Sequence, residues 1–170
     1  GFPLVVKPLN EGSSVNVFIC NKNNVLKILG KLNDYGEVLL EKYIPGREIQ
    51  VAILADKVLG AIELKPTRKF YDYEAKYNPK ARTEHIIPVK ISKSKYKEIT
   101  KIALKAHKIL NCRGVTRSDF RYYKNSFYLL ETNTQPGMTS LSLVPEIAKF
   151  NNINFKNLIK KILNDASINK

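Results

Sequence analysis

Apolar and polar residues alternate with a period of two over several short stretches of the chain, and with a period near 3.6 over others. Alternation predicts strands, because successive side chains of a strand point to opposite faces. The predicted strands are residues 4–8, 15–20, 37–44, 48–53, 58–64, 85–89, 115–123 and 127–133. The longer period predicts helices at 23–32, 92–110, 143–150 and 155–163. Strands and helices mixed in this order indicate an α+β fold.

The turn-forming pair Pro45-Gly46 is the predicted boundary between two lobes. The strand that follows it carries Ile49, Val51 and Ile53 in alternation with polar or small residues. This pattern predicts a half-buried strand with Glu48 on its polar side and residues 58–64 as its hairpin partner. Residues 66–83 are polar, rich in tyrosine and contain two prolines, which predicts a long functional loop.

A second hairpin is predicted late in the chain. Its strands, residues 115–123 and 127–133, flank the turn-forming residues 124–126. A loop centred on Asn125 pairs residue 123 with residue 127, and counting back from there sets Asp119 opposite Glu131. By the same count, Arg117 lies opposite Asn133, so all four side chains share one face of the sheet.

These four side chains suggest a definite chemistry. Carboxylate and amide oxygens from Asp119, Glu131 and Asn133 suit Mg2+, which proteins bind through a few carboxylates together with phosphate oxygens and water. Arg117 beside them would hold a phosphate or a developing oxyanion. The alternative is a solvated face with a surface Arg-Asp pair. A register slip of one residue would turn the acids away from each other.

Composition narrows the class of protein. The 170 residues, 44% of them hydrophobic, predict one domain, or one domain with part of another. The chain has no apolar run long enough for a bilayer and no secretion signal, so we expect a soluble, cytoplasmic protein. Cys20, Cys112, His85 and His107 lack partners at metal-ligand spacing, which argues against a zinc site or a disulfide framework.

The charge allows more than one interpretation. The chain has 29 basic and 15 acidic residues, a net charge of +14. Such an excess can mark a nucleic-acid-binding module. The lysines are scattered, however, and those at residues 90–105 resemble the solvated side of an amphipathic helix, which is the favoured interpretation. The same charge would attract an anionic small substrate such as a nucleotide.

Three further segments are candidates for nucleotide chemistry. Lys7 ends a strand before the small-residue loop 10–14, where an ammonium group and backbone N–H groups could cradle phosphates. Residues 41–44 could offer backbone groups to an adenine ring, with Glu48 reaching the ribose. The aromatic and charged run 70–77 suggests a lid that supplies Lys76 to a phosphate. Each has a plainer alternative, an ordinary strand end or an exposed loop, and the P-loop and GxGxxG motifs are absent.

Taken together, these segments resemble the D-alanine-D-alanine ligase family of the ATP-grasp superfamily, over essentially the whole chain. The resemblance rests on five motifs in order: VVKPLNEGSSV (5–15), LLEKYIPGRE (39–48), FYDYEAKY (70–77), RSDF (117–120) and LLETNTQPGMTSLSLVP (129–145). It implies an ATP-grasp fold of antiparallel sheets with flanking helices. Residues 1–44 would be part of the central lobe and residues 45–170 the carboxy-terminal catalytic lobe.

The resemblance also assigns roles. For ATP these are Lys7 on the α- and β-phosphates, Glu41, Lys42, Tyr43 and Ile44 at the adenine, Glu48 on the ribose, and Lys76 on the transferred phosphate. Tyr77 would bond the loop serine Ser13. Asp119, Glu131 and Asn133 would bind two Mg2+ ions, with Mn2+ as a possible substitute. Arg117 and the Gly137 N–H would stabilise the oxyanion, and Ser142 and Leu143 would bind the second D-alanine's carboxylate.

The implied reaction joins two D-alanines through an acyl phosphate for peptidoglycan synthesis, in a homodimer that uses neither nucleic acid nor membrane. Related ligases that join D-alanine to D-lactate or D-serine, and other carboxylate-amine ligases, are alternatives, as is a module that binds nucleotide without turnover. The family's amino-terminal domain is missing, so we expect this chain to be inactive alone. Asn16 stands where the family usually has Gly, and Thr116 and Gln135 are also less usual; Asn tolerates positive φ.

Overall fold

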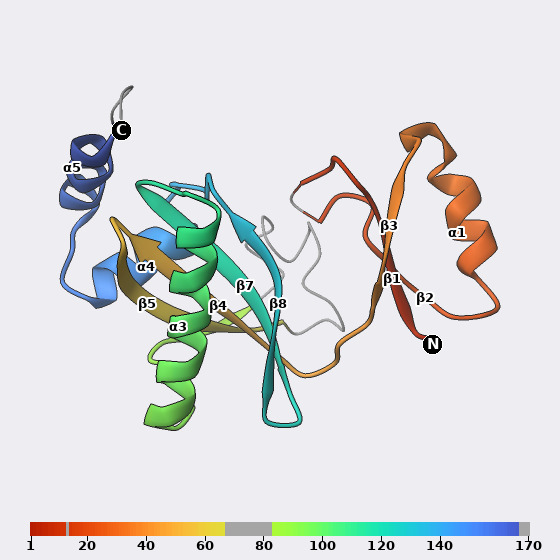
Figure 1. Ribbon diagram of the computed structural model, residues 1–170, viewed down its shortest axis with the longest axis horizontal. Helices are drawn as coiled ribbons and strands as arrows, with labels where there is room; N and C mark the ends of the chain where they lie inside the picture. The colour runs from red at the N-terminus through yellow and green to blue at the C-terminus, as the bar shows by residue number, and fades with distance from the viewer. Residues whose placement is uncertain (13, 67–82, 167–170) are drawn as a thin grey trace. The chain divides into compact units, whose positions relative to one another are not determined.

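The computed structural model describes residues 1–12, 14–66 and 83–166. The chain forms two compact units (Figure 1). Of the described residues, one unit comprises 1–12, 14–45, 66 and 83, and the other comprises 46–65 and 84–166. The sheets in both units are antiparallel and carry flanking helices, so the α+β prediction is confirmed. No helix among the described residues is long and apolar enough to cross a membrane.

The first unit is built on a three-stranded sheet. Strand β1 (Leu4–Pro8) lies between β2 (Phe18–Cys20) and β3 (Val38–Lys42). The helix α1 (Val25–Lys31) and the 3-10 turn η1 (Asn33–Tyr35) connect the last two strands. Val6, Cys20 and Leu32 form its small buried core. Burial raises the pKa of the Cys20 thiol, because a thiolate is disfavoured away from water.

The second unit contains a five-stranded antiparallel sheet in the order β6-β5-β4-β7-β8. Its strands are β4 (Arg47–Leu54), β5 (Lys57–Lys65), β6 (Glu84–Ile86), β7 (Val115–Tyr123) and β8 (Ser126–Asn133). The central strand β4 pairs with β5 on one side and with β7 on the other. Strands far apart in the sequence are thereby brought together, which sets β4 beside the late hairpin.

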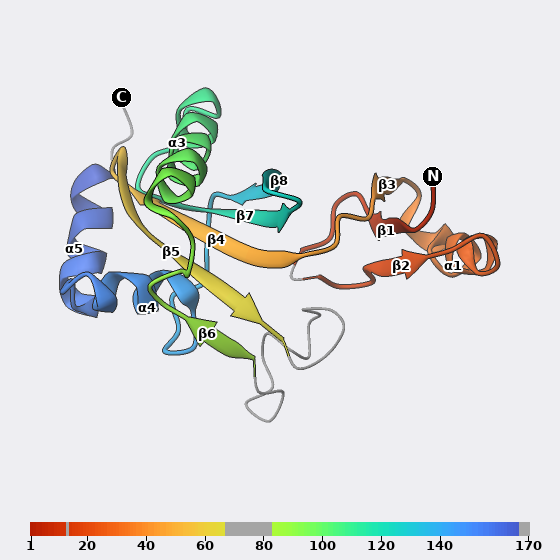
Figure 2. The ribbon, with the colours of Figure 1, turned by 90° about the horizontal axis from the view of Figure 1, so that it is seen from below.

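Helices cover both faces of this sheet (Figure 2). Helix α3 (Lys93–Ile109) lies on one face, and α4 (Leu143–Phe150), followed by α5 (Phe155–Asp165), lies on the other. Polar side chains cap two of these helices, as Ser92 Oγ accepts from the Lys95 N–H at 3.2 Å and Asn154 Oδ1 accepts from the Asn157 N–H at 2.9 Å. Such caps satisfy backbone donors that a helix cannot satisfy itself.

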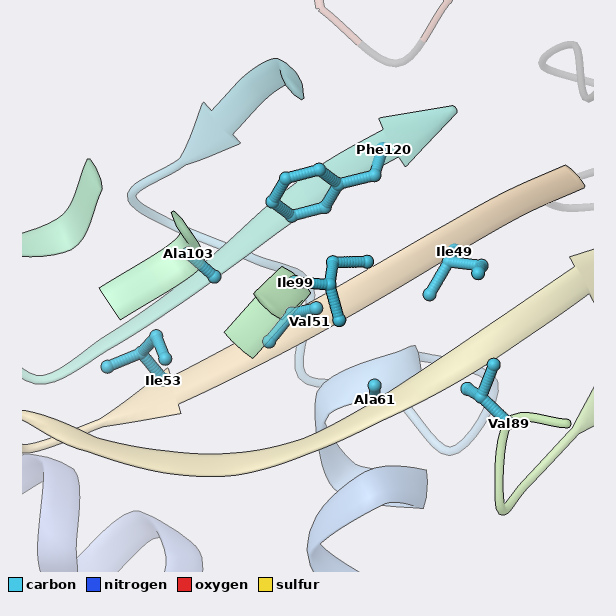
Figure 3. Packing of buried hydrophobic residues seen from close by; sticks show 8 residues of the cluster. All are labelled: Ile49, Val51, Ile53, Ala61, Val89, Ile99, Ala103 and Phe120. Carbon is cyan, nitrogen blue, oxygen red and sulfur yellow. The ribbon is translucent and has the colours of Figure 1, made fainter. Parts of the chain in front are cut away.

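The main core lies between the sheet and α3 (Figure 3). Ile49, Val51 and Ile53 on β4 point to the same side and pack with Phe120 of β7 and with residues of α3. The cluster is completed by Ala61, Val89, Ile99 and Ala103. Burying a side chain of the size of Ile or Phe contributes roughly 1.5–3 kcal/mol, so each large member of this cluster stabilises the unit.

The prediction that β4 is half buried is wrong, because its other face is covered as well. Gln50 is only 1% exposed and Ala52 is fully buried. Gly60 of β5 pairs with Ala52, and a Cβ on Gly60 would come within 2.7 Å of the Ile147 side chain of α4. Helix α4 therefore packs closely on the face that the polar residues of β4 share.

Most element boundaries lie close to those predicted, and the exceptions have local causes. Strand β2 begins at Phe18 rather than at residue 15, because Ser14 and Asn16 adopt positive φ values of 60° and 54° in the preceding turn. The expected tolerance of Asn16 for positive φ is thus confirmed. Strand β6 ends at Ile86, short of the predicted Val89, which instead packs into the core.

Candidate active site

The late hairpin closes through a tighter turn than predicted. Tyr123 pairs with Ser126, not with residue 127, so only Lys124 and Asn125 form the turn, with φ values of 46° and 63°. Two consecutive positive φ values match the twist of a hairpin. Asn125 is held in place, because its Oδ1 accepts from the Tyr122 hydroxyl at 2.9 Å and its carbonyl accepts from Lys95 Nζ at 2.7 Å.

A bulge then restores the register on which the site depends. Phe120 pairs with Leu129, whereas the preceding Asp119 pairs with Glu131, so Leu130 is an extra residue on β8. An extra residue on one strand shifts all later pairs by one. As a result, Asp119 lies opposite Glu131 and Arg117 lies opposite Asn133, and both predicted pairs are confirmed. The four residues share one face of the hairpin, because each pair is opposite and two residues from the next.

Arg117 and Asp119 are paired with each other on this face. The Arg117 Nε and Nη2 atoms donate to the two Asp119 oxygens at 2.7 and 3.0 Å, while the two side chains are only 13% and 10% exposed. A carboxylate so far withdrawn from water needs a compensating charge, and a two-pronged guanidinium contact also fixes its orientation. The site face therefore presents a carboxylate whose direction is set by its neighbour.

Glu131 and Asn133 complete the oxygen donors. Glu131 is exposed and makes no hydrogen bond or ion pair among the described residues. Asn133 Oδ1 accepts from the Gln135 N–H at 2.9 Å and retains a second lone pair. No group of three or more His, Cys, Asp or Glu side chains in the described ranges suits a metal ion. Two carboxylates and an amide oxygen nevertheless fit Mg2+, which completes its shell with water and phosphate oxygens.

Glu48 lies on the same sheet face as this donor set. It pairs in register with Arg121 of β7, and Gln50 of the same strand pairs with Asp119. Glu48 Oε2 is 3.2 Å from Arg121 Nη2, and Glu48 Oε1 accepts from Gln50 Nε2 at 3.4 Å. The place of Glu48 on this side of β4 was predicted, whereas Gln50 and Arg121 were missed, although the same alternation of faces would have indicated both.

The loop after β8 brings the other predicted residues of this unit together. Ser142 Oγ accepts from the Thr139 N–H at 3.0 Å and lies 2.9 Å from Thr139 Oγ1. A Cβ on Gly137 would come within 2.8 Å of Ser142 Oγ, so only glycine fits there without displacing the serine. Leu143 begins α4 and is buried. Gly137 and Ser142 are thus neighbours in a turn that leads directly into a helix N-terminus.

The first unit carries Lys7 and the residues predicted at the adenine. Lys7 Nζ lies 2.8 Å from Glu41 Oε2, both side chains being partly exposed. Lys42 ends β3, the Tyr43 N–H donates to the Pro3 carbonyl at 3.2 Å, and Ile44 follows the strand. The structure therefore joins Lys7 to Glu41 directly, in an ion pair that the sequence did not predict. Ser13, Lys76 and Tyr77 lie outside the described residues, as does most of the predicted loop 66–83.

A comparison of the whole chain decides the family. The family described as "D-ala D-ala ligase C-terminus" matches residues 1–164. The chain belongs to this family. A curated relative, the D-alanine–D-alanine ligase of Pelagibacter ubique (strain HTCC1062), is 65% identical over 169 residues, which are 99% of this chain and 56% of the relative. The resemblance noted in the sequence is thereby confirmed.

Solved structures agree with this assignment and confirm the ATP-grasp fold. The Bacillus anthracis D-alanine–D-alanine ligase complexed with ATP has a TM-score of 0.81 and 29% identity, over 97% of this chain and 52% of that one. A D-Ala:D-Ser ligase of Enterococcus faecalis has a TM-score of 0.82 and 28% identity, over 96% of this chain and 49% of that one. The family member described here thus spans about half the length of the proteins it matches.

Proposed function

We propose that this chain is the carboxy-terminal catalytic portion of an ATP-dependent D-alanine-D-alanine ligase. The observation that carries the proposal is the hairpin face. There, Arg117 donates two hydrogen bonds to Asp119, and Glu131 and Asn133 lie opposite this pair. This face combines hard oxygen donors with a fixed cation, which is what a reaction between anions requires. The 65% identity to a curated D-alanine–D-alanine ligase supports the same conclusion independently.

The first step is the attack of one D-alanine carboxylate on the γ-phosphate of ATP, which releases ADP and leaves an acyl phosphate. Two anions must approach each other, so the site has to neutralise charge. In our proposal, Asp119, Glu131 and Asn133 would hold two Mg2+ ions, or Mn2+ in their place, and bound metal would offset part of the negative charge of the phosphates. Arg117 fixes the orientation of the Asp119 carboxylate, because it donates to both of its oxygens.

In the second step, the amine of a second D-alanine attacks the acyl carbon and phosphate leaves. An oxyanion develops on the former carbonyl oxygen, and it needs donors that are already in position. The Arg117 guanidinium, oriented by its two-pronged contact with Asp119, is the first proposed donor to this oxyanion. The Gly137 N–H is the second proposed donor, and Ser142 packs so closely on Gly137 that a Cβ there would lie 2.8 Å from the Ser142 Oγ.

The remaining roles complete the proposal for ATP. Lys7 would bind the α- and β-phosphates, and the ion pair with Glu41 holds its ammonium group beside the segment proposed for the adenine, Glu41 to Ile44. Glu48 would accept from the ribose hydroxyls. Lys76 would bind the transferred phosphate, and Tyr77 would bond Ser13. The phosphates of ATP are strongly anionic, and the two lysines would offset that charge.

The second D-alanine is proposed to bind at the turn before α4. Ser142 and Leu143 would receive its carboxylate, since a helix N-terminus offers unpaired N–H groups to an anion. A D-serine acceptor is the alternative, because the Enterococcus faecalis D-Ala:D-Ser ligase has a similar fold. The much higher identity to the Pelagibacter ubique relative favours D-alanine.

Several broader assignments belong to the same proposal. Residues 1–44 would form part of the ATP-grasp central lobe and residues 45–170 its carboxy-terminal lobe. The complete enzyme would act as a homodimer in the cytoplasm, where ATP is available, and would need neither nucleic acid nor a membrane. Because the relatives are about twice as long, the 170 residues alone would not complete the reaction.

The test uses a hybrid enzyme, in which these 170 residues follow the amino-terminal remainder of the Pelagibacter ubique relative. We expect phosphate release from ATP that requires both D-alanine and Mg2+. When D-serine or D-lactate is offered together with D-alanine, the product should still be the D-alanine dipeptide. The 170-residue chain alone serves as the second sample and should release none. Hybrid enzyme that binds Mg-ATP yet forms no dipeptide would contradict the proposal.

A further inference from the structure

The Glu48 carboxylate is held at both of its oxygens by residues of the same sheet face. Arg121 Nη2 lies 3.2 Å from Oε2, and Gln50 Nε2 lies 3.4 Å from Oε1, a long hydrogen bond. Glu48 and Arg121 are each only 12% exposed. With a partner on each oxygen, the carboxylate cannot rotate freely about its terminal bond, so its plane is fixed.

Arg121 is itself fixed from the other side. Its Nη1 donates to the Gly46 carbonyl at 3.2 Å. Gly46 has a φ of 108°, and a Cβ there would lie 2.3 Å from the Tyr122 carbonyl oxygen, so no other residue fits this position without distortion. One string of contacts therefore runs from the Gly46 carbonyl to Arg121, from Arg121 to Glu48, and from Glu48 to Gln50.

The position of Gln50 in this string is costly, since its Oε1 is buried and has no hydrogen-bond partner among the described residues. Rotating the amide would not help, because Oε1 would then face the Glu48 carboxylate and two acceptors would repel each other. A buried acceptor without a partner destabilises a fold, and such groups call for an explanation. In the observed orientation, the Gln50 amide donates to Glu48, while its own oxygen has no hydrogen-bond partner among the described residues.

We propose that Gln50 is a positioning residue that, together with Arg121, orients the Glu48 carboxylate to receive both hydroxyls of a ribose. A carboxylate has about four lone-pair sites, so an oxygen that accepts from a protein group can also accept from a ligand. Two oxygens held in a fixed plane match the two hydroxyls of a vicinal diol. Selectivity for ATP over 2′-deoxy-ATP therefore depends on Gln50. The inference rests on the proposed function, in which Glu48 contacts the ribose.

The experiment measures nucleotide affinity and thermal stability in the hybrid enzyme. Mg-ATP and Mg-2′-deoxy-ATP are titrated into wild type, Gln50→Met and Gln50→Glu. Met keeps the length of Gln without either polar atom, and Glu keeps its shape but has no N–H to donate. We expect wild type to prefer ATP by about tenfold or more, a value typical of a hydrogen bond to a charged group. In both variants the preference should fall to about twofold or less.

Thermal unfolding separates positioning from a general structural role. Gln50→Met removes the unpaired buried oxygen, so the apo protein should melt at the same temperature as wild type or higher. The control is Ser118→Ala, which removes a buried hydroxyl bonded to Thr132 at 3.0 Å on the opposite face of the sheet. That variant should melt at a lower temperature and keep the wild-type preference for ATP.

The outcomes distinguish this inference from the proposed function. A Gln50→Met enzyme that keeps the full preference for ATP would overturn the inference while leaving the ligase proposal intact. Wild type that binds ATP and 2′-deoxy-ATP equally would overturn it as well, because Glu48 would then not receive the diol. Wild type that binds no Mg-ATP at all would instead contradict the proposed function.

Discussion

Asp119 of β7 and Glu131 of β8 lie directly opposite each other, and Arg117 holds the Asp119 carboxylate from its own strand. This pairing depends on two compensating features, a two-residue turn at Lys124-Asn125 and a one-residue bulge at Leu130. Either feature alone would move Glu131 out of register with Asp119. The oxygen donors converge because the hairpin contains both.

Replacement of Arg117 by Lys should slow the reaction far more than it lowers stability. Lys cannot reproduce the two-pronged contact with Asp119, and it is a weaker match for an oxyanion. We expect kcat of the hybrid enzyme to fall by about 100-fold, the loss typical of an oxyanion donor. Steady-state phosphate release measures it.

The matched control is Arg47→Lys. Arg47 makes the same kind of contact with Glu63, at 2.7 and 2.6 Å, on the face of the sheet that α3 covers, and this contact raises the pKa of Arg47. The control should lose similar stability and keep kcat within about twofold, because the Arg47 side chain lies on the opposite face of the sheet from the proposed site. Equal kcat losses in both variants would mean that Arg117 acts only through the fold.

Gly46 should be irreplaceable by alanine for reasons of backbone geometry. A Cβ would meet the Tyr122 carbonyl oxygen at 2.3 Å, and φ is 108°. We expect Gly46→Ala to lower the free energy of unfolding by about 3 kcal/mol or more. At Gly30 in α1, no atom of the described residues lies within 4 Å of the place that a Cβ would take, so Gly30→Ala should instead stabilise by about 0.5–1 kcal/mol. Urea unfolding of both variants checks the contrast, and similar destabilisation by both would refute the geometric account.

His107 should make the fold less stable in mild acid. Its side chain is 1% exposed, its Nδ1 lies 2.8 Å from Thr116 Oγ1, and Nε2 has no hydrogen bond among the described residues. Burial lowers the pKa of His107 below its ordinary value, while the charges of Asp56 and Asp165 act in the opposite direction and that of Lys108 adds to the lowering. The neutral ring is therefore the form that the folded protein favours.

The sign of the pH dependence follows from this shift. As the pH falls through about 6.5, the unfolded chain binds a proton at His107 before the folded chain does, so stability is lost. We expect wild type to lose more unfolding free energy between about pH 7.5 and about pH 5.5 than His107→Gln, which cannot take up the proton. Parallel pH profiles for the two proteins would show that the His107 pKa does not differ between the folded and unfolded chains.

The sequence predicted the site face well because strand alternation is a local property. Recognising the two strands does not by itself bring the site residues together. The strands must also pair in the register that sets Asp119 opposite Glu131 and Arg117 opposite Asn133. The register was predicted from a three-residue turn, which is wrong, and without the bulge, which was not foreseen. The two errors cancel. Neither Asn125 nor Leu130 carries a pattern that distinguishes a tight turn with a bulge from a wider turn.

Burial could not be predicted in the same way. The polar residues of β4 suggested a solvated face, yet Gln50 is almost fully buried, and α4 packs on the same side of the sheet near Gly60. Packing of this kind depends on residues far along the chain, such as Ile147, which no local pattern reveals. The same holds for the Lys7–Glu41 ion pair, which depends on β1 and β3 lying side by side.

The central claim is that the hairpin face binds the magnesium of Mg-ATP, and titration calorimetry of Mg-ATP into the hybrid enzyme tests it most directly. Glu131→Ala should weaken binding by about tenfold or more, as loss of a metal-binding group typically does. Glu98→Ala, which removes an exposed carboxylate of α3 paired with Lys95, should bind as wild type does. Undiminished binding of Mg-ATP by Glu131→Ala would contradict the account.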